Sequence, residues 1–278
     1  MTFLDYLSNA HTHSHLSDGH NTLEDMVKKA FDSGYISIGI TDHSPVFYSN
    51  NFEIKSIDEY VEKVCQIKKH YEGQLEIICG LEYDFDTNLI LPKEIAYTIG
   101  SVHTIKTPSN NLFKIENGCE NFIKGVNFFY NGSFINAAKD FFEQTLESSL
   151  RPNVDIVGHF DLISKYNSSV KTIFDDHEKK YLEYAFDAVD SILSKRPEMI
   201  FEINTGCIPR AKRLMHYPSI PILKRIREKK GRIILNSDAH LTKDLNAGFD
   251  FALKNLSDIG FKKIVRVRNF GFEELKIK

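Results

Sequence analysis

The sequence predicts a distorted (β/α)7 barrel, an α/β fold in which seven parallel strands alternate with helices. Short apolar or β-branched runs recur seven times along the 278 residues, and most are followed by an amphipathic segment. Because each helical crossover returns the chain in the same direction, this alternation favours a parallel sheet. Each run also ends in side chains that can bind a metal. Such residues gather at the C-terminal strand ends of a barrel, whereas an open sheet collects them only near its switch point.

The seven expected strands are recognised by their apolar runs, which are bounded by polar residues. The first is read from FLDYLSNAH, so we expect the chain to begin with a strand. The others are ISIGITDH, LEIICGLEYD, AYTIGSVH, VDIVGHFD, MIFEINTG and RIILNSDAH. Together they cover residues 3–11, 36–43, 75–84, 96–103, 154–161, 199–206 and 232–240.

Helices are expected between these runs. Apolar residues spaced at i, i+3, i+4 and i+7 predict several of them, and Thr22 with Asp25 resembles a capping box at the start of the first. Gly34, Gly73, Gly231 and Gly260 each stand at the C-terminal end of an expected helix, where glycine commonly ends a helix. The longest irregular stretch, residues 106–131, is a candidate lid or rim insertion in a single domain spanning residues 1–278. The expected helices cover residues 21–34, 56–73, 134–150, 175–196, 219–231 and 242–260.

Composition narrows the class of protein. Hydrophobic residues make up 42% of the chain, which is enough to bury a full core. The net charge of −3 argues against a nucleic-acid partner, which calls for a basic face. No apolar run approaches the roughly 20 residues of a membrane span. The four cysteines have no tight spacing, and with no basic leader we expect free thiols in a cytoplasmic protein.

Ligand-type residues mark the ends of the expected strands. The stretch HTHSHLSDGH places four histidines and one aspartate in ten residues. Alternation along a strand points His11 and His13 to the same side, which makes them a chelating pair. The later runs add TDH, GLE, SVH, GH and SDAH at the same edge of the sheet. Histidines buried for packing alone would not collect there with carboxylates beside them, so the set predicts a metal site.

The ligand types indicate the chemistry. Imidazole and carboxylate without thiolate suit zinc, iron or manganese. The set is too large for one ion, which favours two or three divalent metals. Neighbouring metals can hold a bridging hydroxide and clamp the oxygens of an in-line phosphoryl displacement, so the site suits phosphoester hydrolysis. Glu82 is the natural bridging ligand because a carboxylate has two oxygens.

The ordered motifs HxH…SDG, TDHS, GLE, GSVH, GHFD and SDAH resemble the PHP (polymerase and histidinol phosphatase) superfamily. GSVH, VDIVGHFDLISKYN, FEINTG and SDAH resemble its histidinol-phosphatase branch more closely. The resemblance runs from about Asn9 to Phe261. It implies a distorted (β/α)7 barrel with a trinuclear metal site, which hydrolyses L-histidinol phosphate to L-histidinol and phosphate in histidine biosynthesis.

Carried over to this sequence, the resemblance implies three metal positions that share one bridging carboxylate. The third position also needs one residue of the SDGH stretch, and Asp18 is favoured over His20. The first position would use His11, His13, Glu82 and Asp238. The second would use Glu82, His103 and His159. The third would use His43, His240 and either Asp18 or His20.

The substrate's phosphate needs cations, and the resemblance places them at Lys165, Arg210 and Arg213. Arginine's planar fork suits phosphate oxygens. A metal-bridging hydroxide would attack phosphorus, so Glu82, Asp238 and His240 are expected to be catalytic. The proton for the leaving alkoxide could come from His240, His20 or Asp42, and His20 is also a candidate for contact with the substrate.

Two other functions remain open. A PHP phosphoesterase could act on nucleotides or nucleic-acid ends, although the chain has no basic stripe. A non-catalytic PHP module could bind metal for structure alone, but such modules lose ligands and the set is complete here. An amidohydrolase barrel also begins with HxH, but it usually needs a strand-end lysine, which these runs lack.

Overall fold

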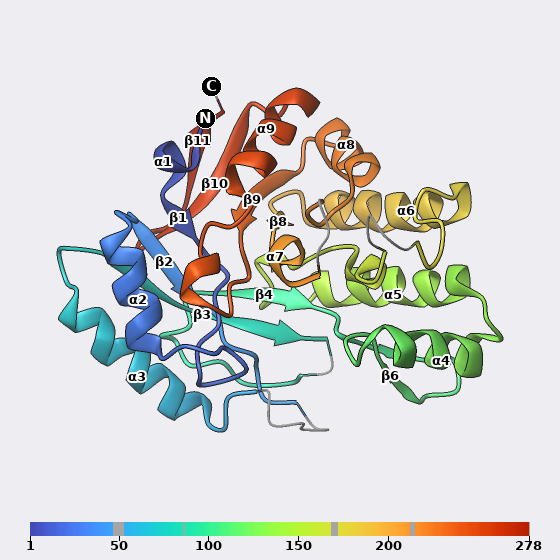
Figure 1. The fold of residues 1–278 in the computed structure, drawn as a ribbon, viewed down its shortest axis with the longest axis horizontal. Helices are drawn as coiled ribbons and strands as arrows, with labels where there is room; N and C mark the ends of the chain where they lie inside the picture. The colour runs from blue at the N-terminus through green and yellow to red at the C-terminus, as the bar shows by residue number, and fades with distance from the viewer. Residues whose placement is uncertain (47–52, 86, 168–171, 212–214, 278) are drawn as a thin grey trace.

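Parallel strands in a single curled sheet form the centre of the molecule (Figure 1). The computed structural model describes residues 1–46, 53–85, 87–167, 172–211 and 215–277. The strand order is β1-β2-β3-β4-β7-β8-β9-β10-β11, and the sheet neighbours up to β10 pair in parallel. These strands are β1 Ser8–Asn9, β2 Ser37–Ile40, β3 Glu76–Asp84, β4 Tyr97–Ser101, β7 Ile156–Val157, β8 Ile200–Asn204, β9 Arg232–Asn236, β10 Lys263–Arg268 and β11 Gly271–Lys276.

The two ends of the sheet meet, so the sheet closes into a distorted barrel. A parallel bridge joins Thr12, just after β1, to Ala239, just after β9. The hydroxyl of Ser37 in β2 donates a 2.6 Å hydrogen bond to the carbonyl oxygen of Val267 in β10. The predicted barrel is therefore confirmed, and all seven predicted runs contribute to it in chain order. The structure adds β10 as a further parallel strand, with β11 antiparallel beside it.

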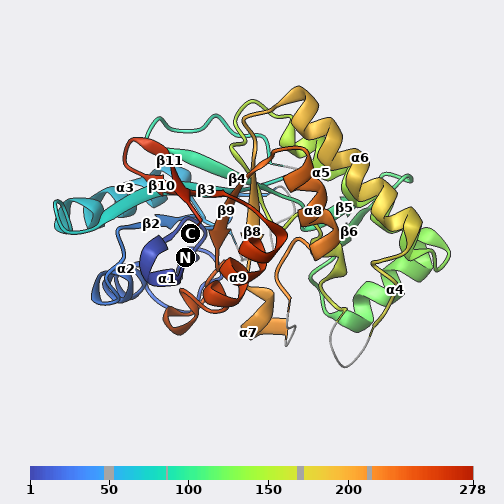
Figure 2. The same cartoon turned by 90° about the horizontal axis from the view of Figure 1, so that it is seen from above.

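Helices cover the outside of the barrel. α2 and α3 lie on one side of the molecule, and α4, α5 and α6 lie on the other (Figures 1 and 2). None of the described helices is long and apolar enough to cross a membrane. The helices are α1 Phe3–Tyr6, α2 Leu23–Asp32, α3 Ile57–His70, α4 Cys119–Tyr130, α5 Phe134–Ser149, α6 Lys179–Lys195, α7 Cys207–Ala211, α8 Ile220–Glu228 and α9 Phe249–Ile259, with short 3-10 turns η1 Leu162–Ser164 and η2 Thr242–Asp244.

The ends of these helices follow from local chemistry. Thr22 accepts a hydrogen bond from the backbone of Asp25, which confirms the predicted capping box of α2. Gly34 after α2 and Gly260 after α9 have φ of 76° and 94°, a conformation that side chains disfavour. Such caps fix where each helix stops and where the next strand begins.

Two apolar layers hold the barrel together. The larger one lies between the sheet and the surrounding helices. The smaller one fills the interior beneath the strand ends, with side chains from six of the strands and Ala10 after β1. It consists of Ala10, Ile78, Tyr97, Ile99, Ile156, Ile200, Ile234, Val265 and Val267. Apolar side chains therefore fill this part of the barrel interior, and the polar side chains of the site lie at the C-terminal ends of the strands.

Two local predictions are wrong. Phe3–Tyr6 forms the helix α1 and not a strand, because Phe3 and Tyr6 bury one helical face and Asp5 caps the first turn from its side chain. The stretch 106–131 is not irregular, because it contains a β-hairpin and α4. The hairpin pairs β5 Thr104–Lys106 with β6 Leu112–Lys114. A role for this stretch as a lid stays a prediction.

Candidate metal centre

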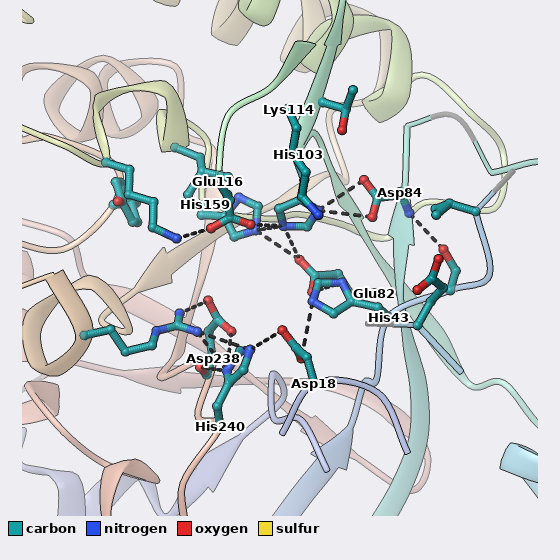
Figure 3. Close-up of a pocket in the computed structure, with 18 of the residues that line it drawn as sticks. Asp18, His43, Glu82, Asp84, His103, Lys114, Glu116, His159, Asp238 and His240 are labelled. Carbon is teal, nitrogen blue, oxygen red and sulfur yellow. Dashed lines mark hydrogen bonds and ion pairs between the residues drawn. The ribbon is translucent and has the colours of Figure 1, made fainter. Parts of the chain in front are cut away.

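Six strand ends bring histidines and carboxylates together around one cavity of about 270 Å³ (Figure 3). His11 and His13 follow β1, and His43 follows β2. Glu82 lies within β3, His103 follows β4 and His159 follows β7. Asp238 and His240 follow β9, which leaves β8 as the strand whose end carries no predicted ligand. The convergence expected from the sequence is therefore present.

The residues of the predicted first position lie close together. Nε2 of His11 is 3.1 Å from Nε2 of His13, and both nitrogens are 3.3 Å from Oε2 of Glu82. Oδ1 of Asp238 is 3.2 Å from Nε2 of His13. Two ligands about 2.1 Å from a zinc ion at the tetrahedral angle lie about 3.4 Å apart. His11, His13 and Glu82 therefore fit around one ion, and Asp238 adjoins this group at His13.

The residues of the predicted second position form a similar group. Nε2 of His103 is 3.1 Å from Nε2 of His159. Oε1 of Glu82 is 3.0 Å from Nε2 of His159 and 3.3 Å from Nε2 of His103. Asp84 orients His103 from behind, since both of its oxygens lie 3.1 Å from Nδ1 of that ring.

Glu82 stands between these two groups. Its Oε2 faces His11 and His13, whereas its Oε1 faces His103 and His159. The carboxylate is buried, and burial alone would raise its pKa. The surrounding histidines, led by His43 and His11, outweigh burial and hold the pKa well below its usual range. This arrangement supports the predicted bridging role of Glu82.

Asp18 belongs to a third group with His43 and His240. Oδ2 of Asp18 is 3.1 Å from Nε2 of His240, and Oδ1 is 3.6 Å from Nε2 of His43. His20 is exposed, and its backbone N–H donates to the carbonyl oxygen of His240. Of the two residues left open by the sequence, the structure thus brings Asp18 to the site.

The turn that carries Asp18 is anchored by Asp42, which follows β2. The carboxylate of Asp42 accepts hydrogen bonds from the backbone and hydroxyl of Ser14 and from the hydroxyl of Ser17. Burial raises the pKa of Asp42 to about 6, against the lowering effect of these serines. At Gly19 an added Cβ would lie 2.6 Å from the backbone carbonyl of His13, so the turn closes tightly on the strand end.

The donor set has the features of a metal centre. Oδ1 of Asp18 is buried and accepts no hydrogen bond from the described residues, which leaves a lone pair for another partner. Three overlapping groups have ligand atoms that all lie within 4.8 Å of one another, and they do not include His159 or Asp238. The groups are His13, Asp18, His43 and His240; His11, His13 and Glu82; and His43, Glu82 and His103. Hard oxygen and imidazole nitrogen donors without thiolate fit zinc, iron or manganese.

The histidines of the cluster are not electrostatically equivalent. Burial alone would lower the pKa of His43, but the carboxylates of Glu82 and Asp18 outweigh it and raise that pKa to about 9. Burial and the nearby His240 ring lower the pKa of His13 to about 3. Without metal, protons therefore occupy some ligand positions at neutral pH and must leave when a metal binds.

Two predicted cations lie at the cavity, and both are already paired with acids. Arg210 donates through Nη2 to Oδ2 of Asp238, and its Nη1 is 2.8 Å from Nδ1 of His240. Lys165, just after η1, forms an ion pair with Glu116. The third predicted cation, Arg213, lies outside the described residues.

Three acidic residues near the site were not predicted. Glu202 in β8 lies beneath the first position, where its Oε1 is 2.6 Å from Nδ1 of His11. Asp84 lies behind His103, and Glu116 follows β6 with its Oε2 3.6 Å from Nε2 of His103. Alternation could have revealed two of them, because Asp84 shares a strand face with Glu82 and Glu202 shares one with Asn204.

Comparisons with known proteins place this chain among PHP proteins. A family model described as PHP domain matches residues 9–206. Histidinol-phosphatase of Bacillus subtilis (strain 168) is 24% identical over 84% of this chain and 92% of that protein. A Schizosaccharomyces pombe protein named "Probable histidinol-phosphatase" is 24% identical over 94% of this chain and 88% of its own.

One solved structure shares the fold over nearly the whole chain. It is histidinol phosphate phosphatase from Lactococcus lactis subsp. lactis Il1403, complexed with zinc, L-histidinol and phosphate. It covers 96% of this chain and 98% of its own, with a TM-score of 0.71 and 20% sequence identity. At this identity the likeness establishes the shared fold.

Proposed function

This chain belongs to the PHP domain family, and on that premise we propose that it is a metal-dependent phosphomonoesterase that hydrolyses L-histidinol phosphate to L-histidinol and phosphate. The reaction would be a step of histidine biosynthesis. The observation that carries the proposal is the pair of oxygens of Glu82, which face two separate groups of histidines.

Relatives and a structural neighbour support the substrate. The curated relatives from B. subtilis and S. pombe carry histidinol-phosphatase names, at 24% identity over most of both chains. The L. lactis neighbour was solved with zinc, L-histidinol and phosphate. We therefore propose zinc as a metal that the centre accepts, with two or three ions bound.

The residues present would hold these ions in three positions. His11, His13, Glu82 and Asp238 would form the first position, and Glu82, His103 and His159 the second. Asp18, His43 and His240 would form the third. When bound, such ions lower the pKa of water and stabilise negative charge on phosphoryl oxygens.

The rest of the reaction is left to the protein's own side chains. The guanidinium of Arg210 lies at the cavity between Asp238 and His240, where it would bind phosphate oxygens and orient the ester. Of the three predicted proton donors for the leaving alkoxide, His240 lines the cavity. Asp42 is buried against Ser14 and Ser17, His20 is exposed, and His240 would be a ligand of the third position, so we assign the proton to none of the three.

Glu116 and Lys165 favour a substrate that carries its own positive charge. A phosphate group that enters the cavity competes with Glu116 for the ammonium of Lys165. Glu116 would then lose its ion pair with Lys165 and lie near a dianion, and like charges about 4 Å apart repel by about 4 kcal/mol at an effective dielectric constant of about 20. A cationic group on the substrate can take the place of Lys165 at Glu116. L-Histidinol phosphate, which carries an amino group, meets this requirement.

The test is a phosphate-release screen on zinc-loaded protein. L-Histidinol phosphate is compared with a panel of phosphomonoesters, nucleotides and a labelled oligonucleotide, and the metal content of the same sample is measured by elemental analysis. We expect L-histidinol phosphate to have the highest kcat/KM. Faster hydrolysis of a nucleotide or oligonucleotide would overturn the substrate, and zinc binding without any hydrolysis would support a non-catalytic module.

A further inference from the structure

Glu202 is a buried carboxylate that none of the three metal positions uses as a ligand. It lies in the middle of β8, and its side chain is fully buried in the barrel interior. A buried charge is costly unless hydrogen bonds compensate it. Glu202 accepts four of them, from a ring nitrogen, a backbone N–H and two side-chain amides.

Two of these four bonds reach residues of different metal positions. Oε1 of Glu202 accepts from Nδ1 of His11, at 2.6 Å, and Oε2 accepts from the backbone N–H of His159, at 2.8 Å. His11 follows β1 and His159 follows β7, and these strands are not neighbours in the sheet. One carboxylate therefore links two distant strand ends across the barrel.

The bond to His11 determines which ring nitrogen can bind a metal. A proton on Nδ1 that is donated to Glu202 leaves the lone pair on Nε2. That nitrogen faces His13 and Glu82, at 3.1 and 3.3 Å. Carboxylates behind ligand histidines fix the ring and its tautomer in this way in many metal sites.

The other two bonds lock the orientation of Glu202. Nδ2 of Asn204 donates to Oε2 and Nδ2 of Asn236 donates to Oε1, both at 2.9 Å. The orientation of each amide is fixed by a second hydrogen bond. Oδ1 of Asn204 accepts one from the backbone N–H of Gly206, and Oδ1 of Asn236 accepts one from the backbone N–H of Ala10. The four hydrogen bonds to Glu202 all come from donors among the described residues. A side chain at this position therefore needs two accepting oxygens to bind all four donors.

We propose that Glu202 is a positioning residue that prepares the first and the second metal position at once. It holds the ring of His11 for the first position and the backbone of His159 for the second. Asp84 provides the contrast, because it contacts the ring of His103 and thus serves the second position alone. The inference rests on the metal positions of the proposed function and not on its substrate.

The test compares zinc binding by Glu202→Gln and Asp84→Asn. Glutamine has the same shape, but its amide nitrogen meets either His11 or His159 as a second donor, and its neutral oxygen binds the other one more weakly than a carboxylate does. Loss of such a supporting group typically costs about 10- to 100-fold in metal affinity. In a competition titration against a chromophoric chelator, Glu202→Gln should weaken two zinc equivalents and Asp84→Asn one. An unchanged zinc titration, or loss of one equivalent in both variants, would overturn the proposal.

Two further measurements separate the proposal from misfolding of the variant. Circular dichroism of metal-free Glu202→Gln shows whether the variant folds, and NMR tests the proposal on the wild-type protein. In zinc-loaded wild type, ¹⁵N NMR of the histidine side chains should show His11 protonated at Nδ1 and bound to zinc through Nε2. Zinc on Nδ1 of His11 would contradict the proposed role. Because both tests use zinc alone, they stand even if L-histidinol phosphate proves not to be the substrate.

Discussion

Arg210 and Asp238 form an ion pair at the edge of the first metal position. Nη2 of Arg210 donates to Oδ2 of Asp238, while Oδ1 of Asp238 lies 3.2 Å from Nε2 of His13. The carboxylate thus faces the ligand cluster with one oxygen and the guanidinium with the other. Asp238 holds Arg210 beside the place where the phosphate would bind.

Replacing Arg210 by lysine should weaken substrate binding although the charge is kept. Lysine lacks the planar fork that binds two oxygens at once, and a hydrogen bond to a charged group contributes about 1.5 to 3 kcal/mol. We expect kcat/KM for L-histidinol phosphate to fall about 10- to 100-fold, mainly through KM. The exposed Arg227→Lys on α8 is the matched control. An unchanged KM would contradict phosphate binding by Arg210.

Asp18 and His20 can be separated by a pair of variants. Asp18→Asn removes the charge from the third group, whereas His20→Gln changes an exposed side chain. We expect Asp18→Asn to bind one zinc equivalent fewer than wild type, and His20→Gln to bind as many as wild type. Elemental analysis after gel filtration counts the ions. Zinc loss in His20→Gln alone would reverse the assignment.

Zinc binding should release protons in a pH-dependent way. The pKa of His43 is raised to about 9 in the folded metal-free protein, so this ring is protonated at pH 7 and must lose its proton to bind zinc. Its contribution to metal-free stability is complete below about pH 6.5 and is lost as the pH rises through about 9.

The measurement is isothermal titration of zinc in buffers of different ionisation enthalpy. Proton release should be largest near pH 7 and should decline above about pH 9. The melting temperature of the metal-free protein should also fall between about pH 6.5 and 9. A proton release that stays constant from pH 7 to 10 would contradict the raised pKa of His43.

Glu116→Gln should reduce the preference for cationic substrates. Without the carboxylate, kcat/KM for L-histidinol phosphate should fall about tenfold more than kcat/KM for a phosphomonoester without an amino group, because one charge-assisted contact is lost. Zinc content should not change. An equal fall for both substrates would argue against recognition of the cation, and loss of a zinc ion would make Glu116 a metal ligand instead.

Much of the ligand framework could be predicted from the sequence. All the ligands except Asp18 lie at the end of an apolar run, and parallel strands of a barrel bring such ends together whatever lies between them. His11 and His13 share a strand face through simple alternation. Asp18 could not be chosen over His20 on these grounds, because its position depends on how the turn after His13 packs against Asp42.

Other features could not be predicted for different physical reasons. Glu116 lies after a hairpin whose pattern is too short to recognise, and it reaches the cavity only through tertiary packing. Phe3–Tyr6 resembles a strand by apolar content, although its burial follows a helical spacing. The strand β10 carries no ligand, so the feature that marked the other strands was absent from it.

The tight packing of Gly19 against the backbone of His13 has a consequence for sequence variation. Because an added Cβ would lie 2.6 Å from that backbone, there is no room for a longer or bulkier turn at this point. The number of residues in the turn is therefore as important for the site as their identity. Insertion of a single residue between Ser14 and Asp18 would displace the carboxylate from His43 and His240, whereas insertions beyond Asn21 would leave it in place.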